Sequence, residues 1–528
     1  MDRRTFLQAM AAAAAASGLT NGAQGEPAAV AVPGGASAAG AEGAGPFPQG
    51  IAAGDPRPDG AVLWTRVDTT APGGTDVGWE VATDDTFDDV VANGIEVAGA
   101  GADGCIHVSV DGLGADRWYA YRFRAGDATS RPGRLRTAPT PGADVDHLRF
   151  VFASCQQIND SHYVAHRAAA AEGADFFMHL GDYVYVDDHA TLSVDDYRGV
   201  LRRFKSDVLL QDCHAAVPFV LMWDDGEFWN GVDAVHDPFQ TELDHRERHQ
   251  NGVDAWFDYM PVLRDADDPN RLYRSLGWGS LADLFVLDVR SYRDAAVDAV
   301  SSLSPDGAVM MQAGRTTLGA AQKAWLEGGL RRSEAAWRLL GNGYNFNWWR
   351  LIDLDHPLLR ALNPRWQHNA GVYAPNEAWD DYQAERLELL RFIDGEGVED
   401  VVSCAGHTHL YFAGDVPDDI DSPTRRSVLT EFTTGSLTAD PDPRTLFGGL
   451  PRGLAEALIH LGERFVISQN PWYAYVNFLD QGYAVVDLTP EELVCEFRLL
   501  DTFDPAATAR TGAAFRVRRG SATVERLA

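Results

Sequence analysis

Residues that could bind metal ions stand directly after short apolar segments at four places in this chain. The four clusters are Ala153-Ser154-Cys155-Gln156-Gln157, Gly181-Asp182-Tyr183-Val184-Tyr185, Trp223-Asp224-Asp225-Gly226-Glu227 and Gly406-His407-Thr408-His409. In open α/β sheets, ligands bind at the carboxyl ends of the strands, so clusters in these positions can meet at one sheet edge. We therefore expect their thiol, carboxylate, phenol and imidazole groups to form a dinuclear metal site.

The residue types indicate which chemistry such a site could do. Thiolate and phenolate are strong anionic donors that suit a metal such as iron, and a carboxylate can bridge two ions. Carboxylate and amide oxygens suit a harder ion such as calcium or magnesium. Two metals about 3.5–4 Å apart can hold a phosphate and supply a deprotonated water for in-line attack. The clusters therefore indicate hydrolysis of a phosphoester.

Several of these residues also have a structural explanation. Cys155 alone could be a small buried hydrophobic residue, and Tyr185 could pack as a core aromatic residue. Asp182 could be a turn residue after a glycine, and Asp224 or Asp225 could cap a helix. Their positions at the ends of apolar strands favour metal binding.

The remaining polar candidates also have both a structural and a functional explanation. His407 and His409 could be buried core histidines, but two histidines that flank one residue after an apolar strand favour metal. Arg290 and Arg293 could equally contact a phosphate or form a structural ion pair. Glu227 is expected to be mostly structural.

The ordered set of motifs resembles the PhoD-like alkaline phosphatases of the calcineurin-like metallophosphoesterase superfamily. Gly181-Asp182-x-x-Tyr185 with Gly406-His407-x-His409 is similar to the superfamily, and its tyrosine resembles that of purple acid phosphatases. The further motifs in the family's order are Gln49-Gly50-Ile51-Ala52-Ala53-Gly54-Asp55-Pro56, Leu63-Trp64-Thr65-Arg66, Phe152-Ala153-Ser154-Cys155-Gln156, Trp223-Asp224-Asp225, Asp288-Val289-Arg290-Ser291-Tyr292-Arg293, Leu318-Gly319 to Trp325-Leu326 and Trp337 to Asn342. Each is weak alone, but together they span Phe47 to Leu500.

The resemblance implies a ligand set for each metal. Cys155, Asp182, Tyr185 and His409 would hold iron (Fe3+). Asp182 would bridge to a second site, and the other ligands of that site are Asp225 and His407, with Asn345 as a weaker candidate. Zinc, manganese and magnesium are alternatives to calcium there.

The resemblance also implies further roles. Asp224 and Asn230 would hold any further calcium. The catalytic residues would be Asp182, Asp225, Arg290 and His407.

The chain departs from the family pattern at two positions. The family usually has Trp-Asp-Asp-His-Glu, and this chain has Gly226 where the histidine stands. The corresponding histidine in related phosphoesterases helps to protonate the leaving group or to bind phosphate, so His189, Arg290 or another group would have to replace it. The family also commonly has Gly-Asp-x-His where this chain has Gly406-His407-Thr408-His409, which is the older superfamily form.

These residues predict a secreted, metal-dependent hydrolase that acts on a small phosphoester substrate. One alternative is a phosphodiesterase of the phospholipase D-like kind. Another is a catalytically weakened phosphate-binding homologue, in which Gly226→His would create activity.

The elements that must position these clusters follow an α/β pattern. Helical patterns over 320–330 and 382–392 carry apolar residues at three- and four-residue spacing. Segments 482–488 and 493–499 predict a β-hairpin. The predicted strands span residues 148–153, 176–180, 217–222, 284–287, 339–340, 401–402 and 428–432. Strands that alternate with helices predict a layered α/β sandwich of the metallophosphoesterase type.

Three regions of different composition precede or contain this pattern. Residues 1–45 are expected to be a signal peptide and a flexible Ala/Gly/Pro-rich tether. Residues 46–140 carry short alternating segments between Gly/Asp turns, which predict a small all-β sandwich of the fibronectin III/Ig-like kind. Residues 146–528 would be the catalytic domain with a C-terminal extension.

The N-terminus is typical of an export signal. Arg3-Arg4 precedes a short Ala-rich stretch from Ala9 to Ala16, which is too short to span a bilayer. Paired arginines indicate the twin-arginine export machinery, which carries folded proteins. The alternative is an amphipathic N-terminal helix, but the run has no polar face. We therefore expect a secreted, extracellular protein without a transmembrane segment.

The composition excludes some classes of partner. The net charge is −33, and the chain has only two lysines, Lys205 and Lys323. Such a surface repels polyanions, which argues against a role as a nucleic-acid scaffold. Excess acid with scarce lysine fits adaptation to high salt, and a GC-rich genome that favours arginine is the alternative. Five widely spaced cysteines without a CxxC pair form neither a disulfide scaffold nor a zinc ribbon.

Overall fold

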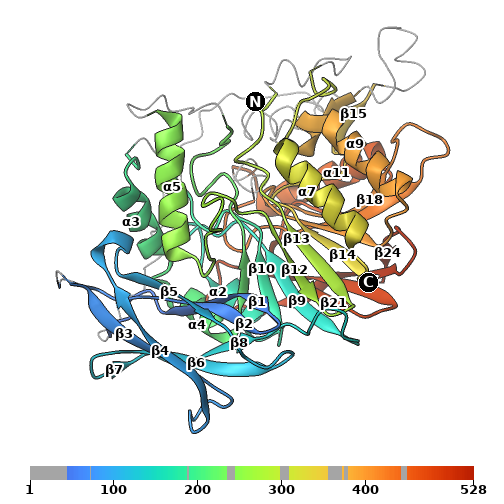
Figure 1. The fold of residues 1–528 in the computed structure, drawn as a ribbon. Coiled ribbons are helices and arrows are strands. Elements are labelled where there is room, and N and C mark those ends of the chain that lie inside the picture. Colours follow the sequence, from blue (N-terminus) through green and yellow to red (C-terminus); the bar gives the residue numbers. More distant parts are fainter. Residues whose placement is uncertain are drawn as a thin grey trace.

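Two large mixed β-sheets form the centre of the molecule, and a smaller antiparallel sheet lies beside them (Figure 1). The computed structural model describes residues 45–527, except residues 70, 72, 187–189, 235–243, 298–308, 355–370, 374–377, 442–446 and 448. Residues 1–44, which hold the predicted export signal and most of the tether, and also His189, lie outside the described residues.

The first large sheet has ten strands. Its parallel centre consists of β9 (Leu148–Ala153), β10 (Phe176–His179) and β11 (Phe219–Leu221), with Phe177 opposite both Val151 and Phe219. All residues of these strands except Arg149 are buried, and their apolar and aromatic residues suit a strand that is covered on both faces. The strands β21 (Gln481–Leu488), β22 (Glu492–Leu500), β23 (Arg510–Arg518) and β24 (Glu525–Arg526) extend the sheet beyond β9. The strands β1 (Ile51–Arg57), β2 (Gly60–Arg66) and β5 (Cys105–Val110) extend it beyond β11.

The second large sheet has seven strands, and its middle is parallel. In spatial order the strands are β12 (Arg274–Trp278), β13 (Ala282–Val286), β14 (Trp337–Gly341), β17 (Val401–Ala405), β19 (Ser427–Thr433), β18 (Tyr411–Pro417) and β20 (Tyr473–Asn477). The two sheets share one hydrophobic core, in which the ring of Phe176 from β10 lies 5.8 Å from the ring of Trp278 from β12. The sheets therefore pack face to face.

Helices cover the outer faces of both sheets. The helices α2 (Val164–Ala170) and α4 (Val208–Ala216) contact β21 and β1 of the first sheet. The helices α7 (Gly319–Arg332) and α9 (Gln383–Gly395) bury their leucine-rich faces against the second sheet. The remaining elements are α3 (Val194–Phe204), α5 (His245–Tyr259), α11 (Arg452–Gln469), the 3-10 turns η1 (Ala100–Ala102) and η2 (Trp379–Tyr382), and the small sheet of β15 (Arg350–Asp353) and β16 (Gly371–Tyr373).

The N-terminal strands form a sandwich that shares a sheet with the rest of the molecule. The strands β3 (Thr75–Ala82), β4 (Val90–Ala98), β6 (Trp118–Ala125), β7 (Ala128–Thr129) and β8 (Gly133–Arg136) make an antiparallel sheet that packs on β1, β2 and β5. Ile51 and Leu63 face this sandwich core, whereas Ala52 and Trp64 on the same strands belong to the large central core. The strand β1 then pairs in parallel with β11 at Gly54 and Phe219.

The predicted fold class, an all-β sandwich followed by layered α/β sheets, is confirmed by this arrangement. The predicted domain limits of 46–140 and 146–528 stay a prediction, because sheet pairing crosses between the two regions. No helix among the described residues is long and apolar enough to cross a bilayer.

Candidate metal centre

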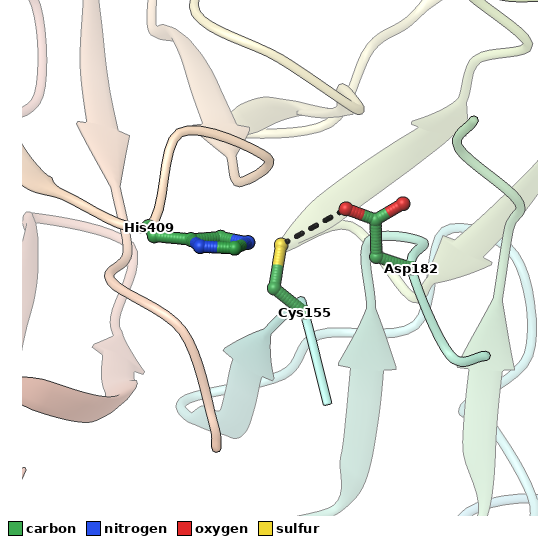
Figure 2. Close-up of side chains that lie close together, drawn as sticks. All are labelled: Cys155, Asp182 and His409. Carbon is green, nitrogen blue, oxygen red and sulfur yellow. Dashed lines mark hydrogen bonds between the residues drawn. The ribbon is translucent and has the colours of Figure 1, made fainter. Parts of the chain in front are cut away.

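The four predicted clusters lie at the carboxyl ends of four strands. Cys155 follows β9, Asp182 and Tyr185 follow β10, and the two histidines of 406–409 follow β17. The carboxylates of 224–225 follow β11. Figure 2 shows the side chains of Cys155, Asp182 and His409 pointing toward one another from separate segments of the chain. The parallel pairing of β9, β10 and β11 brings their ends to one edge, as the sequence predicts.

One group of potential ligands contains a thiol, a carboxylate and an imidazole. Ligand atoms of Cys155, Asp182 and His409 lie within 4.8 Å of one another. The thiol of Cys155 donates to Asp182 Oδ2 over 3.3 Å, and Oη of Tyr185 lies 3.3 Å from the same oxygen. Tyr185 Oη also lies 3.0 Å from His409 Nε2. The four residues predicted to hold iron are therefore together.

The ring of His409 is oriented for metal binding. Its Nδ1 lies 3.1 Å from the backbone carbonyl oxygen of Asp440, which can only accept a hydrogen bond. Nδ1 therefore carries the proton, and the lone pair of Nε2 faces Tyr185. Metal-binding histidines are commonly held by such a contact from the other ring nitrogen.

A second group shares Asp182 with the first. Ligand atoms of Asp182, Asp224, Asp225 and His407 lie within 4.8 Å of one another, and all four side chains are buried. His407 Nδ1 lies 2.7 Å from Asp224 Oδ2, and Asp225 Oδ2 accepts from the backbone N–H of Gly231 over 2.7 Å. Because Asp182 belongs to both groups, it occupies the position of a bridging carboxylate.

Arg290 lies inside this second group. Its guanidinium is 0% exposed, donates to Asp224 Oδ1 and lies 3.6 Å from Asp225 Oδ1. It also lies 3.2 Å from His407 Nδ1 and packs over the ring of Tyr344. The structure thus places Arg290 in a buried ion pair with the carboxylates. Arg293 is buried too, and its Nε donates to the carbonyl of Val232 over 2.7 Å.

Three other positions that the sequence analysis discussed belong to neither of these two ligand groups. Asn230 is exposed on the turn after the Asp224–Asp225 pair, and Asn345 is fully buried on the segment after β14. Gly226 faces the Asp182 carboxylate through its backbone N–H, which donates to Oδ1 over 2.9 Å. A Cβ atom at this glycine would lie 2.7 Å from that same oxygen.

Charges and burial set the pKa values of these groups. Burial raises the pKa of Asp182 to about 6, and the negative charges of Asp225 and Asp224 add to this effect. Burial opposes ionisation of Asp224 and Asp225 as well, but Arg290 and His407 outweigh it and hold both pKa values below their usual range. Burial also disfavours the charged form of His407, but these carboxylates outweigh it and raise its pKa to about 9. Of the three carboxylates in this second ligand group, Asp182 is thus the one whose charge Arg290 and His407 offset least.

A metal cation fits this donor set. It would offset the unfavourable burial of the Asp182 charge, since a bound cation inverts the local preference for the protonated form. Thiol, phenol, carboxylate and imidazole groups in one buried cluster are the donors expected of an iron site. The identity of the metals stays a prediction.

The backbone at four of these ligands is held in a sparsely populated conformation. Cys155, Asp182, His407 and His409 have φ values of 62°, 53°, 68° and 58°. A non-glycine residue in the left-handed region costs about 1–3 kcal/mol and persists only where the surroundings enforce it. The sharp turns that this conformation makes point the four side chains back across the ends of the strands.

The sequence indicates a mostly structural role for Glu227, but not the backbone groups that Glu227 and Ser154 hold. Glu227 is buried, and its carboxylate accepts from the backbone N–H groups of Tyr183, Asp224 and Asp182 over 2.7, 2.8 and 3.0 Å. The hydroxyl of Ser154 accepts from the backbone N–H of His407 over 3.2 Å. Glu227 lies in one short acidic segment with Asp224 and Asp225, so no local pattern separates its role from theirs.

Comparisons with known proteins agree over most of the chain. The family model described as "PhoD-like phosphatase" matches residues 150–497, and that described as "PhoD-like phosphatase, N-terminal domain" matches residues 34–139. Alkaline phosphatase D of Bacillus subtilis (strain 168) is 30% identical over 499 residues, which cover 89% of this chain and 80% of that protein. A solved structure of PhoD is 27% identical, covers 92% of each chain and superimposes with a TM-score of 0.78.

Proposed function

The chain belongs to the PhoD-like phosphatase family and is a phosphoric ester hydrolase, and from this premise we propose that it works with two metal ions bridged by Asp182. The observation that carries the proposal is the place of Asp182 in both buried groups of ligands. A carboxylate shared between two ligand groups is the arrangement that a dinuclear hydrolytic site requires.

Different residues would hold the two ions. Cys155, Asp182, Tyr185 and His409 would hold iron, because they combine thiolate and phenolate donors. Asp225 and His407 would complete the second site, with calcium as the proposed ion and zinc, manganese or magnesium as alternatives. When bound, the ions would neutralise charge on the phosphate oxygens and lower the pKa of a water molecule.

The chain's own residues organise this site. The carbonyl of Asp440 keeps the proton on His409 Nδ1, so that Nε2 faces the site. Arg290 is placed to balance the charge of Asp224 and Asp225, and it holds His407 between itself and the carboxylates. A positive group that is fixed in this way needs little reorganisation when negative charge develops on a substrate.

Metal content and turnover of phosphomonoester and phosphodiester substrates test this function. The protein as isolated is analysed for metals, and turnover is measured with p-nitrophenyl phosphate and bis-p-nitrophenyl phosphate. We expect a transition metal near one per chain and release of p-nitrophenol. Faster turnover of the diester would favour the phosphodiesterase alternative. Absence of both metal and turnover contradicts the proposal.

Replacement of the thiolate tests the iron site. Cys155→Ser should reduce iron content to a small fraction of wild type and lower kcat/KM by about 100-fold or more, since serine is a far weaker anionic donor. Cys105→Ser is the matched control, because Cys105 is also a buried thiol but lies on β5, the edge strand of the ten-stranded sheet. Equal iron content in the Cys155→Ser variant and wild type would exclude the thiolate as a ligand.

We also propose that the protein is secreted by the twin-arginine route. The support is the Arg3-Arg4 pair before a short Ala-rich stretch. Replacement of both arginines by lysine should keep the full-length precursor inside the producing cells. Export of this variant at the wild-type level would contradict the proposal.

A further inference from the structure

Gly226 occupies a tightly closed part of the metal centre. We propose that Gly226 is a positioning residue, which lets the turn of residues 225–227 close onto Asp182 because it has no side chain. The alternative is that Gly226 merely lacks the family's histidine side chain and leaves an empty pocket in its place. The effect on turnover rests on the proposed function, whereas the effect on metal binding can be measured without it.

Both backbone groups of Gly226 hold the loop that carries two predicted iron ligands. Its N–H donates to Asp182 Oδ1 over 2.9 Å, and its carbonyl accepts from the N–H of Val186 over 2.8 Å. Oδ2 of Asp182 is thereby turned toward Cys155 and Tyr185, each 3.3 Å away. The turn thus selects which carboxylate oxygen faces each part of the site.

The structure has no room for a side chain at this position. A Cβ atom on Gly226 would lie 2.7 Å from Asp182 Oδ1, 2.7 Å from the carbonyl oxygen of Val184 and 3.2 Å from Tyr185 Cδ1. Two of these three atoms have little freedom, because one is backbone and the other belongs to a short, hydrogen-bonded carboxylate. A side chain would therefore push the turn away from the loop and not enter open space.

The turn cannot move without its neighbours. Asp225 lies directly before Gly226 and belongs to the second ligand group, and its carboxylate is anchored on the N–H of Gly231. Glu227 lies directly after it and accepts from N–H groups on both loops. A shift of Gly226 must therefore displace Asp182, Asp225 or the contacts of Glu227. Addition of the histidine that is usual in the family should disturb this site and not restore a catalytic group.

Metal titration of two variants tests the proposal. Metal-free wild type, Gly226→Ala and Gly226→His are titrated with Co²⁺ and followed by visible absorption and by the melting temperature. We expect about 10-fold or weaker Co²⁺ binding in both variants, a changed Co²⁺ spectrum and a smaller rise in melting temperature on metal addition. Turnover of p-nitrophenyl phosphate should fall in both. Gly395→Ala is the control, since no atom lies within 4 Å of a Cβ at that glycine in α9.

A double-mutant cycle separates positioning from general damage. The fall in melting temperature that Gly226→Ala causes in metal-free protein should shrink in an Asp182→Ala background, because the carboxylate it strikes is gone. Recovery of folding in that background would support the proposal even if Gly226→Ala alone does not fold. An equal loss in both backgrounds, wild-type Co²⁺ binding in Gly226→Ala, or a gain of turnover in Gly226→His would each overturn it. Wild type that binds Co²⁺ but hydrolyses neither ester would contradict the proposed function alone.

Discussion

Glu227 shows how one buried side chain can hold two loops of a metal centre. Its two carboxylate oxygens accept three backbone N–H groups, two from the loop after β10 and one from the loop after β11. Burial and the charge of Asp182 raise the pKa of Glu227 well above its usual range, and the backbone N–H groups of Asp224 and Tyr183 oppose that shift. Loss of this acceptor would leave buried donors unpaired, which costs about 1–3 kcal/mol for each group.

Replacement of the Glu227 carboxylate should weaken metal binding, and the loss should exceed that caused by an equally destabilising substitution far from the site. Glu227→Gln keeps the shape but places an amide N–H₂ against a backbone donor, so we expect about 1–3 kcal/mol lower unfolding free energy and about 10-fold weaker metal binding. Glu385→Gln is the matched control, since Glu385 is also buried and accepts from the N–H groups of Thr317 and Leu318. Urea unfolding and metal titration of both variants check this. Equal metal affinity in the two variants would contradict a role of Glu227 at the site.

Lys205 should make stability depend on pH. Burial lowers its pKa from 10.5 to about 7, and its Nζ lies 4.3 Å from the ring of Trp64 and 3.4 Å from Tyr183 Oη. Below about pH 7 the lysine is charged in both states. Between about pH 7 and 10.5 the unfolded chain binds the proton and the native chain does not, so the unfolding free energy rises with pH.

Comparison with Lys205→Met isolates this effect. From pH 6 to pH 9 the stability of wild type should rise by about 2–3 kcal/mol relative to the variant, at about 1.4 kcal/mol for each pKa unit. Urea unfolding of both proteins at the two pH values measures the difference. A stability difference that does not change with pH, or one that falls as the pH rises, would contradict the buried, easily deprotonated lysine.

At the residue scale, the sequence indicated which candidate ligands lie together better than it indicated the groups that orient them. Cys155, Asp182 and His409 could be found because each directly follows an apolar strand. The role of Glu227 depends on N–H groups from two loops that are far apart in sequence, so no local pattern indicates it. The closeness of Gly226 to Asp182 depends on the direction of a Cα–Cβ bond, which only coordinates give.

At the scale of elements, strands and helices with strong local signals were predicted well. The predicted strand 148–153 coincides with β9, and the predicted helix 320–330 lies within α7. The predicted hairpin of 482–488 and 493–499 lies within β21 and β22. The helix α11 was not predicted. Its apolar residues do not all face the core, since Leu454 and Leu461 are about half exposed.

The pairing of β1 with β11 was also beyond prediction, because it joins residues about 165 positions apart and has no local signature. Gly54, the residue of β1 in this pair, is also closely approached from another segment, since a Cβ there would lie 2.2 Å from the carbonyl oxygen of Pro261. The segment at Pro261, just after α5, can lie this close to β1 only because Gly54 has no side chain.

Gly54→Ala should therefore loosen this junction. We expect about 1–3 kcal/mol lower unfolding free energy, the usual range for a forced steric overlap in a packed region. Gly78→Ala in β3 is the control, since its Cβ would meet its nearest neighbour at 3.8 Å. Urea unfolding of both variants measures the cost. Equal stability of the two variants would show that β1 can adjust without loss.

At the scale of the whole molecule, the net charge of −33 should make stability depend on salt. One of the two lysines is buried, and the other, Lys323, pairs with Glu388, so lysine adds little free positive charge to the surface. Self-repulsion of surface carboxylates is screened as the Debye length falls from about 10 Å at 0.1 M salt to about 3 Å at 1 M. We propose on this basis that the protein is adapted to high salt.

Thermal unfolding in increasing KCl tests this proposal. The melting temperature should rise by several degrees between 0.1 and 1 M and then level off, since screening is nearly complete by then. A constant or falling melting temperature over this range would contradict it. A rise that continues linearly at higher concentration would indicate a general salting-out effect in place of screening.

The ten-stranded sheet that contains β1 also affects how the chain can fold while it is being synthesised. Its central strands β9, β10 and β11 lie between β1, β2 and β5 from the start of the chain and β21 to β24 from its end. A ribosome releases the first group hundreds of residues before the last, so the sheet cannot close while the chain is still being made. Long-range pairing of this kind folds slowly and leaves strand edges uncovered in the meantime. The nascent chain should therefore need chaperone protection until its final strands emerge.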